Sequence, residues 1–339
     1  MKDHLLIVNK LKAKISETLA DYRHAPKEGM TVRHVSRWID QFPIEDRTFV
    51  LEETARLLEM GYFTKKQYEK CITELAENEK NEKYFERAAF LSIQEDGTSQ
   101  SELIESLNTE CTEGIYTVSR HSSKARVDSF KEFIYFDDVC FSGRKVIDDL
   151  IWFVNDYDLR EVEIFIYFLC SHTSAVWYVK ETLKKSFQDR NIIINIGDGA
   201  LRHVENRLKY NDRSGVFWPT QESVAIPTWV SDKAIYTGTY RNNFVPAKIF
   251  PDEARRNRFE AVLTSIGFRI LSNSETVKKP LKPLGFSTFN GVGFGGTTFT
   301  YRNCPNNVPL VYWWGNYEPV GSEAVDCWYP LMKRIVYNR

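Results

Sequence analysis

The stretch that decides the fold is Phe133-Ile-Tyr-Phe-Asp-Asp-Val-Cys-Phe-Ser-Gly-Arg-Lys145. Residues 133–136 are apolar or aromatic at every position, which is typical of a strand buried on both faces of a parallel sheet. Asp137 and Asp138 follow at once, so the pattern places two carboxylates at the carboxyl end of that strand. Ligands of open α/β sheets bind at this end. We therefore expect the two acids to line a ligand site.

A tight turn and a helix follow the acids. Ser142 and Gly143 are typical turn residues, and residues 146–154 are predicted to be helical. The backbone N–H groups of residues 142–145 would open that helix and face any anion above it, because the first N–H groups of a helix lack partners within the helix. Acids that accept hydrogen bonds from vicinal hydroxyls, next to such a turn, match a ribose phosphate.

The segment resembles the phosphoribosyl-diphosphate motif of type I phosphoribosyltransferases, in which hydrophobic residues precede two acids and a Thr/Ser-Gly turn. The resemblance implies that Asp137 and Asp138 hold the ribose hydroxyls and act as the catalytic pair. It also implies that the following loop wraps the 5-phosphate, which here assigns ribose-phosphate binding to Ser142, Gly143, Arg144 and Lys145.

Two positions depart from that family pattern. Phe141 stands where purine-salvage members have a catalytic Asp, and Lys145 stands where a hydroxyl residue closes the phosphate loop. The missing acid argues against ordinary purine salvage, although Arg144 and Lys145 still supply positive charge. A Ser-Gly turn before a helix is also ordinary capping chemistry, so the motif alone leaves a purely structural interpretation open.

Composition limits the class of protein. A chain of 339 residues is expected to form two or three domains, and 45 basic residues against 46 acidic ones exclude a global polycation. The six cysteines form no CxxC pair and indicate reduced thiols. Neither a signal peptide nor a run of ~20 apolar residues is evident, so we expect a cytoplasmic protein without a membrane segment.

The pattern divides the chain into three parts: a helical domain at 1–85, an α/β core at 86–223 and an aromatic-rich extension at 224–339. The first part resembles a winged-helix or adaptor module and is expected to bind a protein partner. Its residues Arg33, His34 and Arg37 form either a basic face for an anionic partner or an ordinary solvated helix face.

In the middle part, predicted strands alternate with predicted helices, which indicates a doubly wound parallel sheet of phosphoribosyltransferase type. The predicted strands are residues 88–93, 115–118, 133–136, 161–170 and 191–196, and the predicted helices are residues 102–107, 146–154 and 173–187. By the same resemblance, Gly97, Thr98 and Ser99 occupy the place of the pyrophosphate loop. Residues 119–126, with His121, occupy the place of the mobile loop.

The last part is predicted to be an α+β, turn-rich extension with an amphipathic helix at 252–270 and a β-rich turn at 291–296. Its Cys304-Pro-Asn-Asn307 segment and the aromatic run after it resemble phosphoribosyltransferase-like proteins of bacterial conflict and anti-phage loci, including retron-associated ones. That resemblance implies a defence context and no particular chemistry.

These patterns lead to one preferred function and two alternatives. The preferred function is binding of phosphoribosyl diphosphate, or a similar nucleotide-like ligand, with Mg²⁺ held by pyrophosphate oxygens, waters and carboxylates, and with transferase activity undecided. The first alternative is a non-catalytic module that senses a ligand or binds a partner. The second is a regulator that binds nucleic acid through the N-terminal helices.

Overall fold

The chain forms two compact units in the computed structural model. One unit is Lys66–Arg207, and the other combines Met1–Lys65 with Leu208–Arg339. The structure describes residues 2–94, 98–197, 201–230, 232–238, 240–274 and 278–336, without the side chains of residues 2 and 80. Within these residues no helix is long and apolar enough to cross a membrane.

The unit Lys66–Arg207 is built on a parallel sheet whose main path has the order β3-β2-β4-β5-β6. The strands are β2 (Ala89–Ser92), β3 (Tyr116–Ser119), β4 (Glu132–Cys140), β5 (Glu163–His172) and β6 (Ile193–Ile196). A short strand, β7 (Arg202–Val204), also pairs in parallel with the end of β5. Each pair is parallel, which confirms the doubly wound sheet predicted from the alternating pattern.

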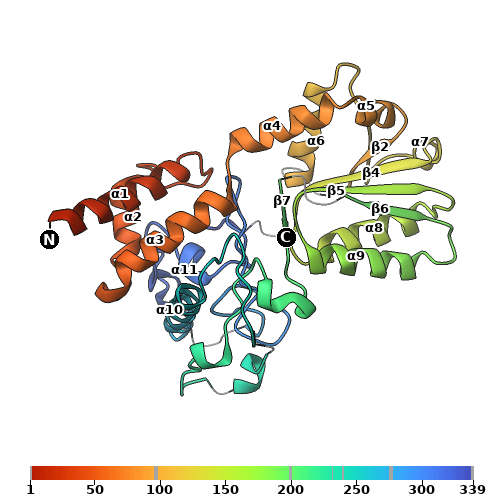
Figure 1. Ribbon diagram of the computed structural model, residues 1–339. Helices are drawn as coiled ribbons and strands as arrows, with labels where there is room; N and C mark the ends of the chain where they lie inside the picture. Colours follow the sequence, from red (N-terminus) through yellow and green to blue (C-terminus); the bar gives the residue numbers. More distant parts are fainter. Residues whose placement is uncertain are drawn as a thin grey trace. The chain divides into compact units, whose positions relative to one another are not determined.

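Helices cover both faces of this sheet (Figure 1). Helices α8 (Arg144–Asp156) and α9 (Thr173–Ser186) lie on one face, and α6 (Ser99–Glu110) lies on the other. The remaining helices of the unit are α4 (Lys65–Ala76), α5 (Glu79–Phe85) and α7 (Lys124–Asp128). Strands covered on both faces are apolar throughout, which explains the uninterrupted run at 133–136.

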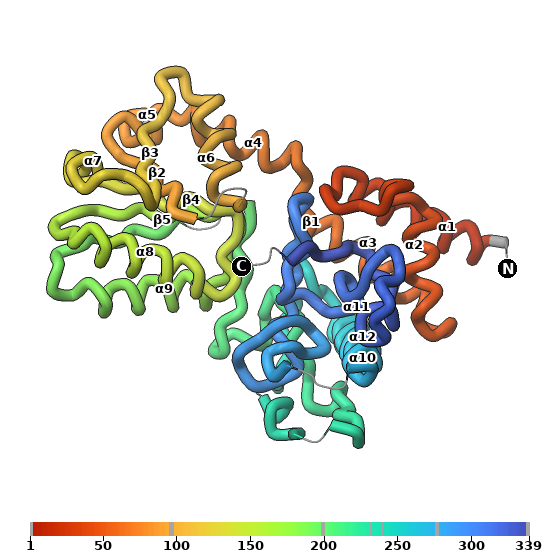
Figure 2. Tube along the Cα trace, turned by 180° about the vertical axis from the view of Figure 1, so that it is seen from behind, coloured from red at the N-terminus to blue at the C-terminus, as the bar shows by residue number. Residues whose placement is uncertain are grey.

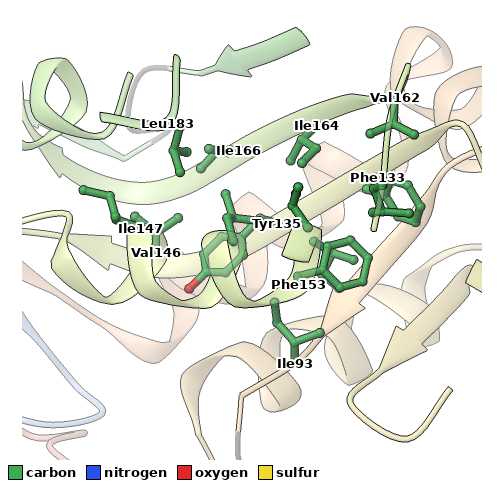
Figure 3. Packing of buried hydrophobic residues seen from close by; sticks show 14 of the residues in the cluster. Ile93, Phe133, Tyr135, Val146, Ile147, Phe153, Val162, Ile164, Ile166 and Leu183 are labelled. Carbon is green, nitrogen blue, oxygen red and sulfur yellow. The ribbon is translucent and has the colours of Figure 1, made fainter. Parts of the chain in front are cut away.

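The core of this unit lies between the sheet and α8 and α9. Figure 3 shows Phe133 and Tyr135 from β4 turned toward Val146 and Phe153 from α8. All four of these side chains are buried, and the rings of Phe133 and Phe153 meet edge to face with centroids 5.2 Å apart. This packing fixes α8 against β4, so the turn between them has little freedom.

The other unit combines the two ends of the chain. Its elements are α1 (Lys2–Thr18), α2 (Val32–Ile39), α3 (Ile44–Gly61), β1 (Tyr62–Phe63), α10 (Glu253–Leu271), β8 (Phe299–Thr300), α11 (Leu310–Trp313), α12 (Glu323–Asp326) and three short 3₁₀ turns. Figure 2 shows the N-terminal helices beside the C-terminal segments that contain α10 and α11. The helix at 252–270 predicted from the sequence is thus present as α10.

Specific contacts join the two ends into one core. Strand β1 pairs in parallel with β8, with Tyr62 opposite Phe299. The indole of Trp38 is fully buried, donates a 2.8 Å hydrogen bond to the Val311 carbonyl and stacks on the ring of Tyr312. The N-terminal helices therefore share a core with the C-terminal segment and do not form a module of their own.

The boundaries of the two units differ from the three-part division made from the sequence. The sequence places boundaries after 85 and 223, whereas the contacts divide the chain after Lys65 and Arg207. Helices α4 and α5 pack with the sheet unit, and the sequence does not predict α5 or β7 at all. Changes in composition along the chain do not show which distant segments share a core, so the boundaries of the two units could not be predicted from the sequence.

One local expectation also changes, at the β-rich turn predicted for residues 291–296. Residues 291–296 contain no strand, and the positive φ angles of Gly291, Gly293 and Gly295 instead let the backbone pass close to neighbouring chain. The expected β-rich turn is therefore an irregular glycine-rich loop, because these glycines adopt backbone angles that a strand excludes.

Candidate functional site

Asp137 and Asp138 lie in β4, the middle strand of the sheet path. Strand β2 pairs with β4 only as far as Phe90 and Ile134, and β6 reaches only to the level of Tyr135 through its pairing with β5. The two acids therefore stand beyond the pairing of β4 with β2, whereas β5 runs beside them and pairs with β4 as far as Cys140. Helix α8 begins at Arg144, a few residues further on, so the acids lie in the carboxyl-terminal part of β4 and close to a helix start. The strand runs on past the acids to Cys140, further than the sequence predicts.

The carboxylate of Asp137 already accepts three hydrogen bonds. Its donors are the Gln94 side-chain amide at 3.0 Å, the Ser99 hydroxyl at 2.7 Å and the backbone N–H of Asp138 at 2.8 Å. An ionised carboxylate offers about four acceptor positions, so Asp137 has little capacity left for a ligand in this conformation. Asp137 is 8% exposed and Asp138 is 9% exposed. Asp137 thus ties the start of α6 to β4, and a ribose hydroxyl would have to share its oxygens or displace a donor.

A third carboxylate, that of Asp149, is connected to Asp137 through hydrogen-bonded side chains. Gln94 also donates to the Tyr135 hydroxyl at 2.7 Å, and that hydroxyl donates to Asp149 at 2.9 Å. Tyr135 is completely buried and Asp149 nearly so, which makes each of these bonds costly to remove. Asp137, Gln94, Tyr135 and Asp149 form one hydrogen-bonded chain from the carboxyl edge to α8.

Two cations lie at the far end of that chain. The Lys145 ammonium is 3.5 Å from Asp149, and the Arg120 guanidinium is 3.8 Å from the same oxygen. Arg120 also stacks over Trp152, with its guanidinium carbon 4.4 Å from the ring centroid. Burial raises the pKa of Asp149 above its ordinary value, although Lys145, the Tyr135 hydroxyl and Arg120 act in the opposite direction.

The proposed pyrophosphate loop is described only in part. Gly97 lies outside the described residues. Thr98 is the N-cap of α6, and Ser99 is its first residue, with the hydroxyl on Asp137. The buried Gln100 accepts hydrogen bonds from the backbone N–H groups of Ile93 and Gln94, which closes the end of β2 onto α6. The described part of the loop therefore lies next to the acids.

Gly143 adopts a left-handed backbone conformation, with φ +75°, and caps α8. A Cβ at this position would lie 2.5 Å from a methyl carbon of Val179 and 3.2 Å from the carbonyl oxygen of Ala175. Gly143 is thus needed because the turn packs against α9. A side chain at this position would point toward α9, into the protein.

The groups expected to hold a phosphate are engaged within the protein. The Gly143 N–H contacts the Cys140 sulfur, and the Arg144 N–H reaches the Ser142 hydroxyl at 3.4 Å, a long and weak hydrogen bond. The Arg144 guanidinium pairs with Asp148 at 2.9 Å, one turn along α8. Both cationic side chains are exposed, so their ion pairs are weak and open to exchange with an anion.

Phe141 occupies the place of the family's catalytic acid. Its ring lies 5.0 Å from that of His172, which is fully buried at the end of β5. Burial, together with Arg202 and His203, lowers the pKa of His172 to about 3, so this ring is neutral. A neutral aromatic pair therefore stands where the family pattern has a charged group. His121, in the turn after β3, is exposed.

Sequence reasoning missed Gln94, Tyr135, Asp149 and Arg120. A signal existed for Gln94, since it is the first polar side chain after a predicted strand, as Asp137 is after another. No local signal marks Tyr135, because an aromatic residue in a buried strand usually contributes only packing.

Among the residues that the structure describes, no group of three or more His, Cys, Asp and Glu side chains is placed to hold a metal ion. Asp137 and Asp138 supply hard oxygen donors, which suit Mg²⁺ when ligand oxygens and waters complete the coordination. The donor set thus fits an ion that arrives with a phosphorylated ligand.

A known family matches most of the chain. A family model described as PRTase-CE, of phosphoribosyltransferase type, matches residues 35–334. The chain belongs to the PRTase-CE family. No curated protein matches it. The PRTase-CE match includes most of both units, so the family is defined by the sheet unit together with the unit that joins the two chain ends.

Proposed function

We propose that this PRTase-CE protein binds phosphoribosyl diphosphate, or a related ribose 5-phosphate, at the carboxyl edge of β4. The observation that supports this most strongly is the position of Asp137 and Asp138 in the carboxyl-terminal part of β4, beyond its pairing with β2, followed by a left-handed glycine turn into α8. In this proposal the acids accept the ribose hydroxyls, and the turn at 142–145 receives the 5-phosphate.

Binding would exchange contacts within the protein for contacts with the ligand. The 5-phosphate would replace the long Arg144 N–H bond to Ser142 and draw Arg144 and Lys145 from their exposed ion pairs. Mg²⁺ bound to the diphosphate would neutralise charge on the departing pyrophosphate. The bond from ribosyl C1 to pyrophosphate then breaks, a bond to the acceptor forms, and the acceptor loses a proton. The acids stabilise positive charge on the ribosyl centre.

A non-catalytic binding module is the second candidate. Phe141 packs on the neutral His172 at the position where purine-salvage members have a catalytic acid, so a charged group is missing at that point. Asp137 accepts three hydrogen bonds from protein donors, which is typical of a structural carboxylate. These observations favour binding without transfer, and the two candidates differ in one measurable product, pyrophosphate.

Ligand binding is tested by the thermal midpoint of unfolding. Phosphoribosyl diphosphate with Mg²⁺ should raise the midpoint, because a ligand at 100 times its Kd stabilises the folded state by about 2.7 kcal/mol. Asp138→Asn should reduce this shift, since it removes a charge and an acceptor at the carboxyl edge. Asp189→Asn is the matched control, because Asp189 is exposed and precedes β6 at the amino ends of the strands. An equal shift in all three proteins would refute binding at the acids.

Catalysis is tested by pyrophosphate release from the wild-type protein with nucleobase, nucleotide and nucleic-acid acceptors. The Asp137→Asn/Asp138→Asn double variant serves as the blank after its circular dichroism spectrum has been compared with that of the wild type. Release above this blank supports the transferase, and release equal to it leaves the binding module.

A role in anti-phage defence is a further proposal, supported by the resemblance of the Cys304-Pro-Asn-Asn307 segment and the aromatic run after it to proteins of such loci. Plaque counts on cells that express the chain with its neighbouring genes test it. Protection that is equal with and without the gene would remove the proposal.

A further inference from the structure

A groove lies in the unit that joins the two chain ends, and none of its lining residues belongs to the candidate site in the sheet unit. Three cavities of about 220, 250 and 690 Å³ open there, and both Arg37 and Tyr329 line all three. Because the three cavities share these two lining residues, they form one groove between α2 and the segment 316–333. The largest cavity is of the size that small-molecule sites have.

Tyr329 is fixed at three points. The Gln41 side chain accepts from the Tyr329 backbone N–H at 2.7 Å and donates to its carbonyl at 2.9 Å. The Tyr329 hydroxyl is 2.7 Å from His34 Nδ1, and His34 Nε2 is 2.8 Å from the Leu331 carbonyl. A carbonyl only accepts, so Nε2 carries the proton, and in the neutral ring Nδ1 accepts from the tyrosine hydroxyl. Burial lowers the pKa of His34, which keeps the ring neutral.

This rigid tyrosine orients Arg37. The guanidinium carbon of Arg37 lies 4.0 Å from the Tyr329 ring centroid, so one face of the guanidinium rests on the ring. Stacking leaves the N–H groups at the edge of the guanidinium directed away from the ring. Because the tyrosine beneath it is already immobile, this arginine loses less conformational freedom on binding than an arginine with no such support.

Arg33 and Arg37 differ from other arginines of the same unit. Arg47, Arg255 and Arg258 each pair with a carboxylate, at 3.1, 2.8 and 2.9 Å. No carboxylate in the described part of the chain lies within 4.0 Å of the Arg33 or Arg37 side-chain nitrogens. The two arginines are four residues apart on α2, hence on one face, and both line the largest cavity.

The charges around the groove are mixed. Its other cations are Lys27 and Lys333, and its acids are Glu28, Glu318 and Asp326. Asp326 is committed to the backbone N–H groups of residues 320–322. The largest cavity therefore has two guanidiniums without carboxylate partners in its wall, together with the Glu28 carboxylate and the Tyr329 ring.

We propose that this groove binds the phosphomonoester group of a small molecule between Arg33 and Arg37, with an aromatic or planar part of the molecule against Tyr329 and Tyr317. A phosphomonoester fits better than a single carboxylate, because it has a charge of about −1.5 to −2 and three acceptor oxygens for two guanidinium forks. This site is separate from the carboxyl edge of β4 and does not depend on the function proposed there.

The test is calorimetric titration with AMP, inorganic phosphate and adenosine, combined with amide hydrogen exchange to locate each binding event. AMP should protect residues 31–41 and 316–333, and adenosine should not. Binding of inorganic phosphate at the same segments would show that the anion alone is enough for binding. Binding of AMP without binding of phosphate would show that the groove also recognises the planar part of the molecule. Both results support the proposal.

Substitutions identify the groups. Arg37→Met should weaken AMP binding at these segments about tenfold or more, because hydrogen bonds to a charged group are lost. Arg33→Met should act in the same direction, and because Arg33 is exposed we expect this variant to fold as the wild type does. Arg258→Met is the matched control, since Arg258 also stacks on an aromatic ring, Phe49 at 4.2 Å, but outside the groove.

Three results would overturn the proposal. The first is unchanged AMP affinity in both Arg33→Met and Arg37→Met. The second is absence of protection at residues 31–41 and 316–333 with 10 mM AMP and with 10 mM phosphate. The third is protection there by a single-stranded oligonucleotide but by neither small probe, which would make the groove a nucleic-acid contact instead.

Discussion

Gly143→Ala provides a direct test of how the turn after β4 is held. The substitution adds one methyl group at φ +75°, where it would meet the Val179 methyl at 2.5 Å and the Ala175 carbonyl at 3.2 Å. The left-handed conformation costs roughly 1–2 kcal/mol for a residue other than glycine. Forcing a methyl group into packed surroundings costs about 1–3 kcal/mol more. We therefore expect the free energy of unfolding of the sheet unit to fall by about 2–5 kcal/mol.

Gly114→Ala is the matched control in the same unit. Gly114 has φ +71°, and a Cβ there would meet only the tip of the Asn108 side chain, at 3.3 Å. This variant should lose only the conformational part, roughly 1–2 kcal/mol. The slowest-exchanging amides of β4 and β5 report the free energy of unfolding of their own unit, so amide hydrogen exchange is the assay.

A second substitution separates strain from contact. Val179→Ala removes the methyl group that the new Cβ would meet, so the loss in the Gly143→Ala/Val179→Ala double variant should be smaller than the sum of the two single losses, by about 1–3 kcal/mol. Equal losses in Gly143→Ala and Gly114→Ala, with additive behaviour in the double variant, would refute the packing argument. The left-handed backbone conformation would then be the remaining structural reason for a glycine at this position.

Three further predictions concern other parts of the molecule. Tyr135→Phe should lower the free energy of unfolding of the sheet unit by about 1–3 kcal/mol, because Gln94 and the buried Asp149 each lose a partner, while Tyr116→Phe at an exposed position should change hydrogen exchange little. The pKa of His172 is about 3 in the folded protein, whereas an unfolded histidine takes up a proton near pH 6.5, so the free energy of unfolding falls as the pH falls. This loss reaches about 2 kcal/mol by pH 5. In thermal unfolding curves at pH 7.5 and pH 5, His172→Phe should remove the loss and His121→Phe should not. Deletion of residues 1–65 should expose amides throughout 208–336 to exchange and leave those of β4 and β5 protected; protection of both segments would contradict the shared core.

The sheet unit follows its sequence closely because its elements are defined by local pattern. The predicted strand at 161–170 is β5 at Glu163–His172, and the predicted helix at 173–187 is α9 at Thr173–Ser186. The apolar run before Asp137 predicts the central strand because only a strand covered on both faces tolerates it. Helix starts were displaced by two or three residues, as at α8 and α6, where turn residues enter the helix.

The site was harder to predict from the sequence, because its hydrogen bonds join residues that lie far apart in the chain. Asp137 meets Gln94 across 43 positions in the chain and Ser99 across 38, and these contacts depend on strand register. The sequence shows the two acids but not that one of them already accepts three hydrogen bonds from protein donors. The basic face at Arg33, His34 and Arg37 changes for a similar reason: His34 is buried on Tyr329, 295 positions away, and only the two arginines reach solvent.

The division of one unit between the two ends of the chain has a consequence for synthesis. Tyr62 emerges from the ribosome early, but its partner Phe299 emerges only after the whole sheet unit and α10. The sheet unit has its complete sequence by Arg207 and can fold while the N-terminal helices still lack the segments that bury Trp38. Any product that terminates before Val311 therefore displays that indole to proteases and chaperones. Ribosome-bound fragments of increasing length should show the sheet unit becoming protease-resistant first, and residues 1–65 only when the chain is almost complete.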